Sequence, residues 1–241
     1  MGLNEKQATI DCNQPGDPEA EKRREPNPRY CQAMVGHTPA DDRRYFDERF
    51  EGLTAAEVRT DAERGAELEL AGSEFENCTF VSCDLTEAVL RGAQFQDCRF
   101  ERCELPMVDL TQVALRTVTF DNCRMTGVDF SPLARDPLGV EASFSSCDLR
   151  FALFRRLDLK GFEFEGCLLG RAAFERCDLA GVAFDGSDLQ GCRFEECDLT
   201  GADLRTARNY LISPLSNKIA GMRVALPEAL GLLAAMDVVV E

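Results

Sequence analysis

The chain has 241 residues, of which 44% are apolar and 29% are charged, so it can bury the core of one main domain. Its 43 acidic and 27 basic residues give a net charge of −16, which argues against binding nucleic acid or an anionic membrane through a basic face. A single histidine, His37, argues against triad catalysis and multi-histidine zinc sites. We therefore expect a cytoplasmic protein with no catalytic, cofactor or metal site and no membrane segment.

The N-terminal part of the chain, up to the start of a repeat at Leu70, differs from the rest. Residues 1–44 contain five prolines among many charged residues, which predicts a disordered polar tail. Residues 45–69 supply the first apolar anchors and are expected to close the N-terminal end of the fold. They form either a cap with a short helix near residues 54–65 or an irregular first coil, and the sequence does not separate the two.

A repeat with a period of five runs from Leu70 to Leu204. Thirteen consecutive central positions from Leu70 to Phe130, and 13 more from Phe144 to Leu204, are all Leu, Phe or Met. A second site, two positions before each centre, usually holds Cys, Ala or Val. A polar residue, often Asp, lies between them, so the repeat reads small–polar–large–polar–polar.

Runs such as Cys83–Glu87 and Ala202–Leu204 resemble the A(D/N)LXX unit of the pentapeptide-repeat proteins. The resemblance covers residues 70–204 and implies an all-β fold, a right-handed quadrilateral parallel β-helix with four pentads per coil. Alternate side chains on an extended segment point to the same side, so both restricted sites would face the axis of such a tube. At four pentads per coil, the 26 repeats would form a rod about 31 Å long.

Four pentads per coil also predict which side chains stack on one another. We expect two opposite aromatic columns, Phe144–Phe164–Phe184 and Phe154–Phe174–Phe194.

Ten of the 12 cysteines occupy the small inward site. We expect them to be buried, reduced thiols, because in-register Cβ atoms ~4.8 Å apart exceed the ~3.8 Å typical of a disulfide. The CxxC-like pairs of metal sites are absent from the sequence.

The repeat is interrupted at Ser131–Gly139, which contains two prolines and is predicted to be a loop near the middle of the rod. It is either a tolerated insertion or a partner-contacting loop, with Arg135 and Asp136 as candidate binding residues.

Residues 205–241 are expected to continue the coil loosely, then to form a helix over Leu226–Met236 and a short strand over Val238–Val240. The helix would cover the open end of the solenoid. The tail resembles C-terminal segments of quinolone-resistance (Qnr-like) bacterial members of the family, which implies a cap or a homodimer contact. The candidate contact residues are Leu226, Leu230, Leu233 and Met236.

The resemblance implies a non-catalytic, protein-binding solenoid. Family members that protect type II topoisomerases (DNA gyrase and topoisomerase IV) from quinolones are acidic rods that occupy the enzyme's DNA groove. Residues 70–204 hold 24 acidic and 13 basic residues, while duplex DNA carries about 18 charges over ~31 Å. One hypothesis is a DNA mimic that protects a topoisomerase from quinolones or toxins. The alternative is an interaction scaffold with a different, unknown protein partner.

For the DNA mimic, the candidate binding acids lie toward the C-terminal coils, where Arg193 is expected to be the only accompanying cation. They are Asp185, Asp188, Glu195, Glu196, Asp198 and Asp203.

Overall fold

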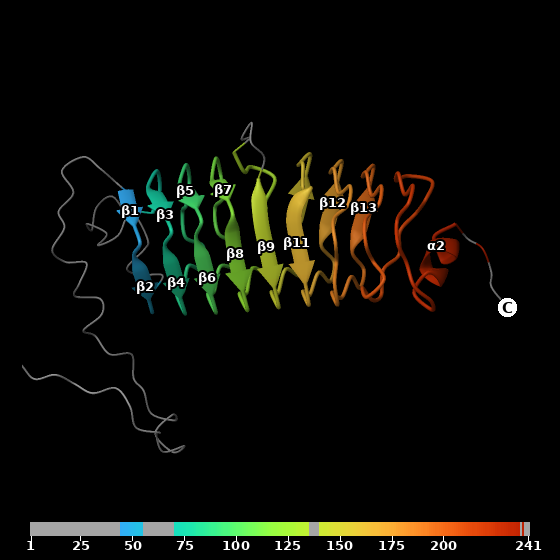
Figure 1. Ribbon diagram of the computed structural model, residues 1–241, viewed down its shortest axis with the longest axis horizontal. Helices are drawn as coiled ribbons and strands as arrows, with labels where there is room; N and C mark the ends of the chain where they lie inside the picture. The colour runs from blue at the N-terminus through green and yellow to red at the C-terminus, as the bar shows by residue number, and fades with distance from the viewer. Residues whose placement is uncertain (1–43, 55–69, 135–139, 237, 239–241) are drawn as a thin grey trace, which may run out of the picture.

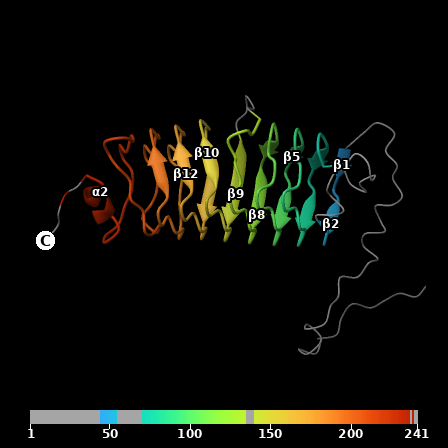
Figure 2. The same cartoon turned by 180° about the vertical axis from the view of Figure 1, so that it is seen from behind.

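A computed structural model describes residues 44–54, 70–134, 140–236 and 238 of the chain. These residues wind into a right-handed parallel β-helix with four sides, which confirms the predicted fold class (Figure 1). Figure 2 shows the same rod from behind, with the coils stacked from β1 at one end to α2 at the other. The large and small sites of each pentad point inward and fill the tube with buried side chains.

Three sides of the rod carry parallel sheets. The six-stranded side consists of β2 (Arg49–Glu51), β4 (Thr79–Val81), β6 (Arg99–Glu101), β8 (Val118–Asp121), β9 (Glu141–Ser145) and β11 (Gly161–Glu165). The four-stranded side consists of β1 (Arg44–Phe46), β3 (Glu74–Glu76), β5 (Gln94–Gln96) and β7 (Ala114–Arg116). The three-stranded side consists of β10 (Leu153–Arg155), β12 (Ala173–Glu175) and β13 (Arg193–Glu195). The fourth, here called the bridge side, is joined by isolated parallel bridges such as Leu168↔Asp188.

The register shows how the interruption is accommodated. Phe80 pairs with Phe100, four pentads further along the chain, but Phe120 pairs with Phe144, so one coil contains four additional residues. The inward side chains stay aligned across this coil because the additional residues lie outside the paired strands. The candidate residues Arg135 and Asp136 lie outside the described residues.

The aromatic columns form as predicted. On the six-stranded side, Phe164 stacks on Phe144 with ring centroids 5.4 Å apart and on Phe184 at 5.1 Å. On the three-stranded side, Phe174 stacks on Phe154 at 4.6 Å. Phe164 and Phe174 meet edge to face across the tube at 6.1 Å, so the two columns also contact each other.

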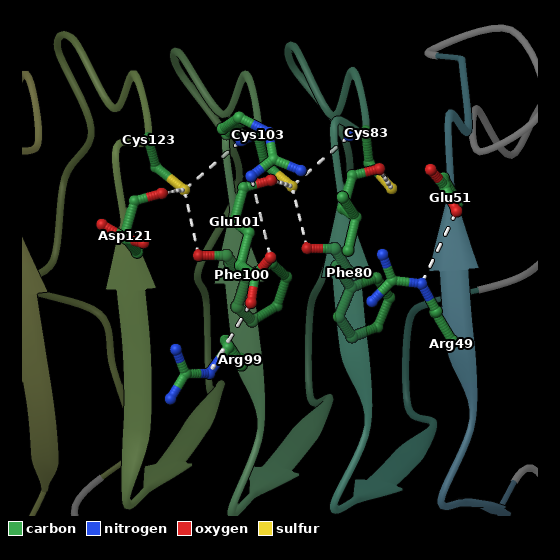
Figure 3. A network of polar contacts seen from close by, with 12 residues as sticks. Arg49, Glu51, Phe80, Cys83, Arg99, Phe100, Glu101, Cys103, Asp121 and Cys123 are labelled. Atoms are coloured by element: carbon green, nitrogen blue, oxygen red, sulfur yellow. Dashed lines mark hydrogen bonds and ion pairs between the residues drawn. The ribbon is translucent and has the colours of Figure 1, made fainter. Parts of the chain in front are cut away.

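The ten described cysteines are free, as predicted, and their thiols also form hydrogen bonds that the sequence interpretation missed. The Cys103 thiol lies 3.4 Å from the Phe80 carbonyl oxygen, and the Cys83 backbone N–H donates to Cys103 Sγ at 3.4 Å (Figure 3). Neighbouring thiols and burial together raise the pKa of Cys123. Cysteine at the small site therefore fills space and also binds backbone groups at the edge of the tube.

The coil continues past the last predicted pentad, as the parallel backbone β-bridge between Asp203 and Arg223 shows. The helix α2 (Leu230–Ala234) follows and is shorter than the predicted Leu226–Met236. Leu232 packs against the core. The helix therefore contacts the end of the rod through Leu232. The four candidate residues for a cap or homodimer contact are 38–78% exposed, so they are not part of the core. They are Leu226, Leu230, Leu233 and Met236. Of the predicted strand, only Val238 is described.

Candidate functional site

The aspartates between the small and large sites have a structural role that the sequence interpretation did not include. Asp188 Oδ1 accepts a hydrogen bond from the Gln190 backbone N–H at 3.1 Å, and Asp198 Oδ1 accepts one from Thr200 N–H at 3.1 Å. Such contacts shape the turn that ends each side of the coil. Asp203 forms the same contact, so three of the six candidate acids help to build the edges of the solenoid.

The six candidate acids do not form one patch. Asp203 forms a backbone β-bridge with Ala183, which continues the six-stranded side. Asp188 lies on the bridge side, and Glu195 is the last residue of β13 on the three-stranded side. Asp198 bridges to Asp178 on the remaining side. One coil visits all four sides, so acids that are neighbours in the sequence point in different directions.

Cations also neutralise half of these acids. The ion pairs are Arg176–Glu196 at 2.7 Å, Lys218–Asp198 at 3.2 Å and Arg205–Asp203 at 2.7 Å. Hydrogen bonding and charge from Arg205 lower the pKa of Asp203 to about 2. The expectation that Arg193 alone accompanies this cluster is therefore wrong.

A different set of acids gathers on the six-stranded side, and we call it the acidic face. It occupies outward positions on β8, β9, β11 and the coil that follows β11. Its members are Asp121, Glu141, Glu163, Glu165 and Asp185. The backbone segments that carry them (117–123, 140–146, 161–166 and 183–187) contain no lysine or arginine.

Hydroxyl groups, rather than cations, contact the acidic face. Ser143 donates to Glu163 at 3.2 Å, and Thr206 donates to Asp185 at 3.0 Å. Within the described part of the chain, none of the five carboxylates has a Lys or Arg nitrogen within 4.0 Å. The face therefore keeps five negative charges over three coil steps, about 14 Å, where duplex DNA carries about eight.

Arginines border the acidic face along the rod. Arg99 and Arg102 lie on the preceding coil, and Arg205 and Arg223 lie on the following ones. The acidic face can be found in the sequence by comparing the outward residues beside the central Leu or Phe of this side at intervals of one coil. Reading consecutive residues does not reveal it.

The other surface features offer weaker sites. An open groove of about 560 Å³ on the three-stranded side has equal numbers of arginine and glutamate residues in its lining, and Arg155 pairs with Glu175 there at 2.8 Å. No group of three His, Cys, Asp or Glu residues in the described segments could hold a metal ion. No helix among the described residues has the length and apolar character needed to cross a membrane.

These features define a class of protein, a β-solenoid with a filled core and its polar chemistry on the outer surface. The chain belongs to the pentapeptide-repeat family. The family model described as a pentapeptide repeat region matches residues 73–135, and the model described as pentapeptide repeats (8 copies) matches residues 167–205.

Solved structures of other pentapeptide-repeat proteins are similar to the chain. Trypsin-treated QnrB1, a plasmid-mediated fluoroquinolone resistance protein, is 19% identical, with 80% of this chain and 99% of that chain covered and a TM-score of 0.48. HetL from the cyanobacterium Nostoc, involved in heterocyst differentiation regulation, is 17% identical, with 80% and 93% covered and a TM-score of 0.39. No curated protein sequence matches the chain.

Proposed function

We propose that the chain is a cytoplasmic, non-catalytic solenoid whose acidic face docks in the basic groove of a DNA-binding protein, with a type II topoisomerase as the partner. The observation that supports this proposal is the acidic face itself. Its five carboxylates lie along three coil steps of one side, and none of them has a Lys or Arg nitrogen of the described residues within 4.0 Å. A field of this sign attracts a basic groove and repels nucleic acid.

The rigidity of the surface favours mimicry of a duplex. Glu163 and Glu165 project from β11, whose inward residues Phe162 and Phe164 are 1% exposed and fixed in the core. The carboxylates therefore repeat at strand spacing on a backbone that does not need to reorganise on binding, which lowers the entropic cost of association. The charge per unit length is about sixty per cent of that of DNA.

The choice of a topoisomerase rests on the resemblance of the repeat and of the C-terminal segment to quinolone-resistance members of the family. A scaffold that uses the same face to bind another basic protein is the alternative.

We also propose that the exposed stripe on and around α2 joins two copies of the chain, because its apolar side chains do not contribute to the core.

A DNA gyrase supercoiling assay with a fluoroquinolone, at two salt concentrations, tests the proposal. We expect the parent to restore supercoiling more effectively at low salt, and the Glu163→Lys, Glu165→Lys variant to fail. The matched control, Glu76→Lys with Glu195→Lys, makes the same charge change on the other two sheet-bearing sides and should behave as the parent.

Equal loss of supercoiling rescue in both variants would show that the acidic face has no specific role. No rescue and no inhibition by the parent at micromolar concentration would exclude the topoisomerase and leave the scaffold with a different partner.

A further inference from the structure

Two apolar side chains project from one edge of the solenoid at positions where polar residues or glycine are usual. Met107 and Phe151 have φ values of 55° and 63°, in the left-handed region that bulky side chains disfavour. Of the 17 described non-glycine residues with positive φ, these two are the only apolar ones. They are 65% and 55% exposed, so burial in the core does not explain them.

Both residues lie along one edge of the solenoid, which we call the apolar edge. It runs between the bridge side and the three-stranded side through Met107, Gly127, Phe151 and Arg171 on consecutive coils, over about 14 Å. A Cβ on Gly127 would lie 3.8 Å from Met107 Cγ, so the missing side chain leaves room between the two apolar groups. Leu168, on the neighbouring bridge side, is also exposed.

Arg171 supplies a cation at one end of this edge. The central carbon of its guanidinium lies 5.9 Å from the centroid of the Phe151 ring. Arg150 nearby is occupied by Asp148 at 2.6 Å, whereas Arg171 has no carboxylate within 4.0 Å among the residues that the structure describes. The Arg171 guanidinium therefore lies over the Phe151 ring, where it could also bind a carboxylate.

We propose that the apolar edge binds a protein segment that places an apolar side chain against Met107 and Phe151 and a carboxylate against Arg171. Exposed aromatic, methionine and arginine side chains are the types that dominate protein interfaces, and strain at exposed positions is retained where function requires it. The chemistry is opposite to that of the acidic face, which lies on another side of the rod. The two surfaces therefore bind different partners or different parts of one partner.

Selection of random peptides displayed on phage, with the full chain as the target, tests this proposal. The counter-target is the Met107→Asn, Phe151→Asn variant, which should stay folded because asparagine tolerates the left-handed region. We expect the selected peptides to pair an apolar residue with Asp or Glu. Their synthetic forms should bind Phe151→Asn and Arg171→Ser about tenfold more weakly, or worse, as expected for loss of a dominant contact.

Two control proteins separate this edge from the rest of the surface. Gln112→Asn changes a left-handed residue on a different edge, and the Glu163→Lys, Glu165→Lys variant changes the acidic face. Both should bind the peptides as the parent does. The proposal is overturned if no peptide is enriched over the counter-target, if the peptides bind all variants equally, or if Phe151→Asn lowers Tm as a core substitution would.

Discussion

Replacement of Phe174 by alanine should strongly destabilise the middle of the rod. Its ring is fully buried and is stacked between Phe154 at 4.6 Å and Phe194 at 5.1 Å. It also meets Phe164 and Phe184 edge to face, each at 6.1 Å. Truncation of a core phenylalanine costs about 3–5 kcal/mol, and each lost aromatic pair adds to the cost of burial by about 0.5–1.5 kcal/mol. We therefore expect a loss near the upper end, about 4–5 kcal/mol.

Urea unfolding followed by circular dichroism measures this loss directly. The matched control is Phe151→Ala, which truncates the same residue type at a 55% exposed position and should change stability by about 0.5 kcal/mol or less. A cost below about 1 kcal/mol for Phe174→Ala, or equal costs for the two variants, would refute the conclusion that the stacked phenylalanines stabilise the core of the rod.

Three further changes test the ends and edges of the rod. Gly231→Ala should lower the free energy of unfolding by about 1–3 kcal/mol, because the new Cβ would lie 2.5 Å from the Tyr210 carbonyl oxygen. An unchanged Tm in a thermal melt would contradict the close packing of α2 against Tyr210. Hydrogen bonding to Thr200 and then Lys218 lowers the pKa of Asp198 to about 2, so its stabilising contribution should be complete above about pH 4 and disappear as the pH falls toward 2. Asp198→Asn should flatten that part of an acid-unfolding curve, and an unaltered curve would argue against the contribution. Glu substitutions at Leu230 and Leu233 should halve the mass in solution; equal masses would refute the proposed dimer.

The stacking of the core could be predicted because the length of one coil determines which inward residues lie above one another. Once four pentads are assigned to a coil, Phe144 and Phe164 must lie one above the other, and the structure places them so. The interruption does not disturb this rule, because the register resumes at Phe144 after four additional residues.

The outer surface could not be predicted by reading along the chain. Asp185 and Asp188 are close neighbours in the sequence yet lie on different sides, whereas Asp121 and Glu163 are far apart in sequence and share one sheet. Cations from neighbouring coils, such as Arg176 beside Glu196, decide which charges remain. The surface charge can therefore be predicted only after each outward residue has been assigned to its side and its coil.

The sequence did not reveal the thiol hydrogen bonds or the bounds of the C-terminal helix, for different reasons. A small apolar residue and a hydrogen-bonding thiol satisfy the same pattern, although Ser187 and Asn217 at this site indicate the second role. Their side chains accept hydrogen bonds from the backbone N–H groups of Cys167 and Cys197. The apolar pattern predicted a helix over Leu226–Met236, but only Leu230–Ala234 is helical, and Leu232 rather than the expected stripe packs against the core.

Displacement of a fluorescent DNA duplex from DNA gyrase by the full chain tests whether the acidic face takes the place of DNA. We expect the chain and DNA to compete for one site, the competition to weaken as salt rises, and the Glu163→Lys, Glu165→Lys variant to compete no longer. A complex in which gyrase holds the duplex and this chain together, or equal competition by the parent and that variant, would contradict it.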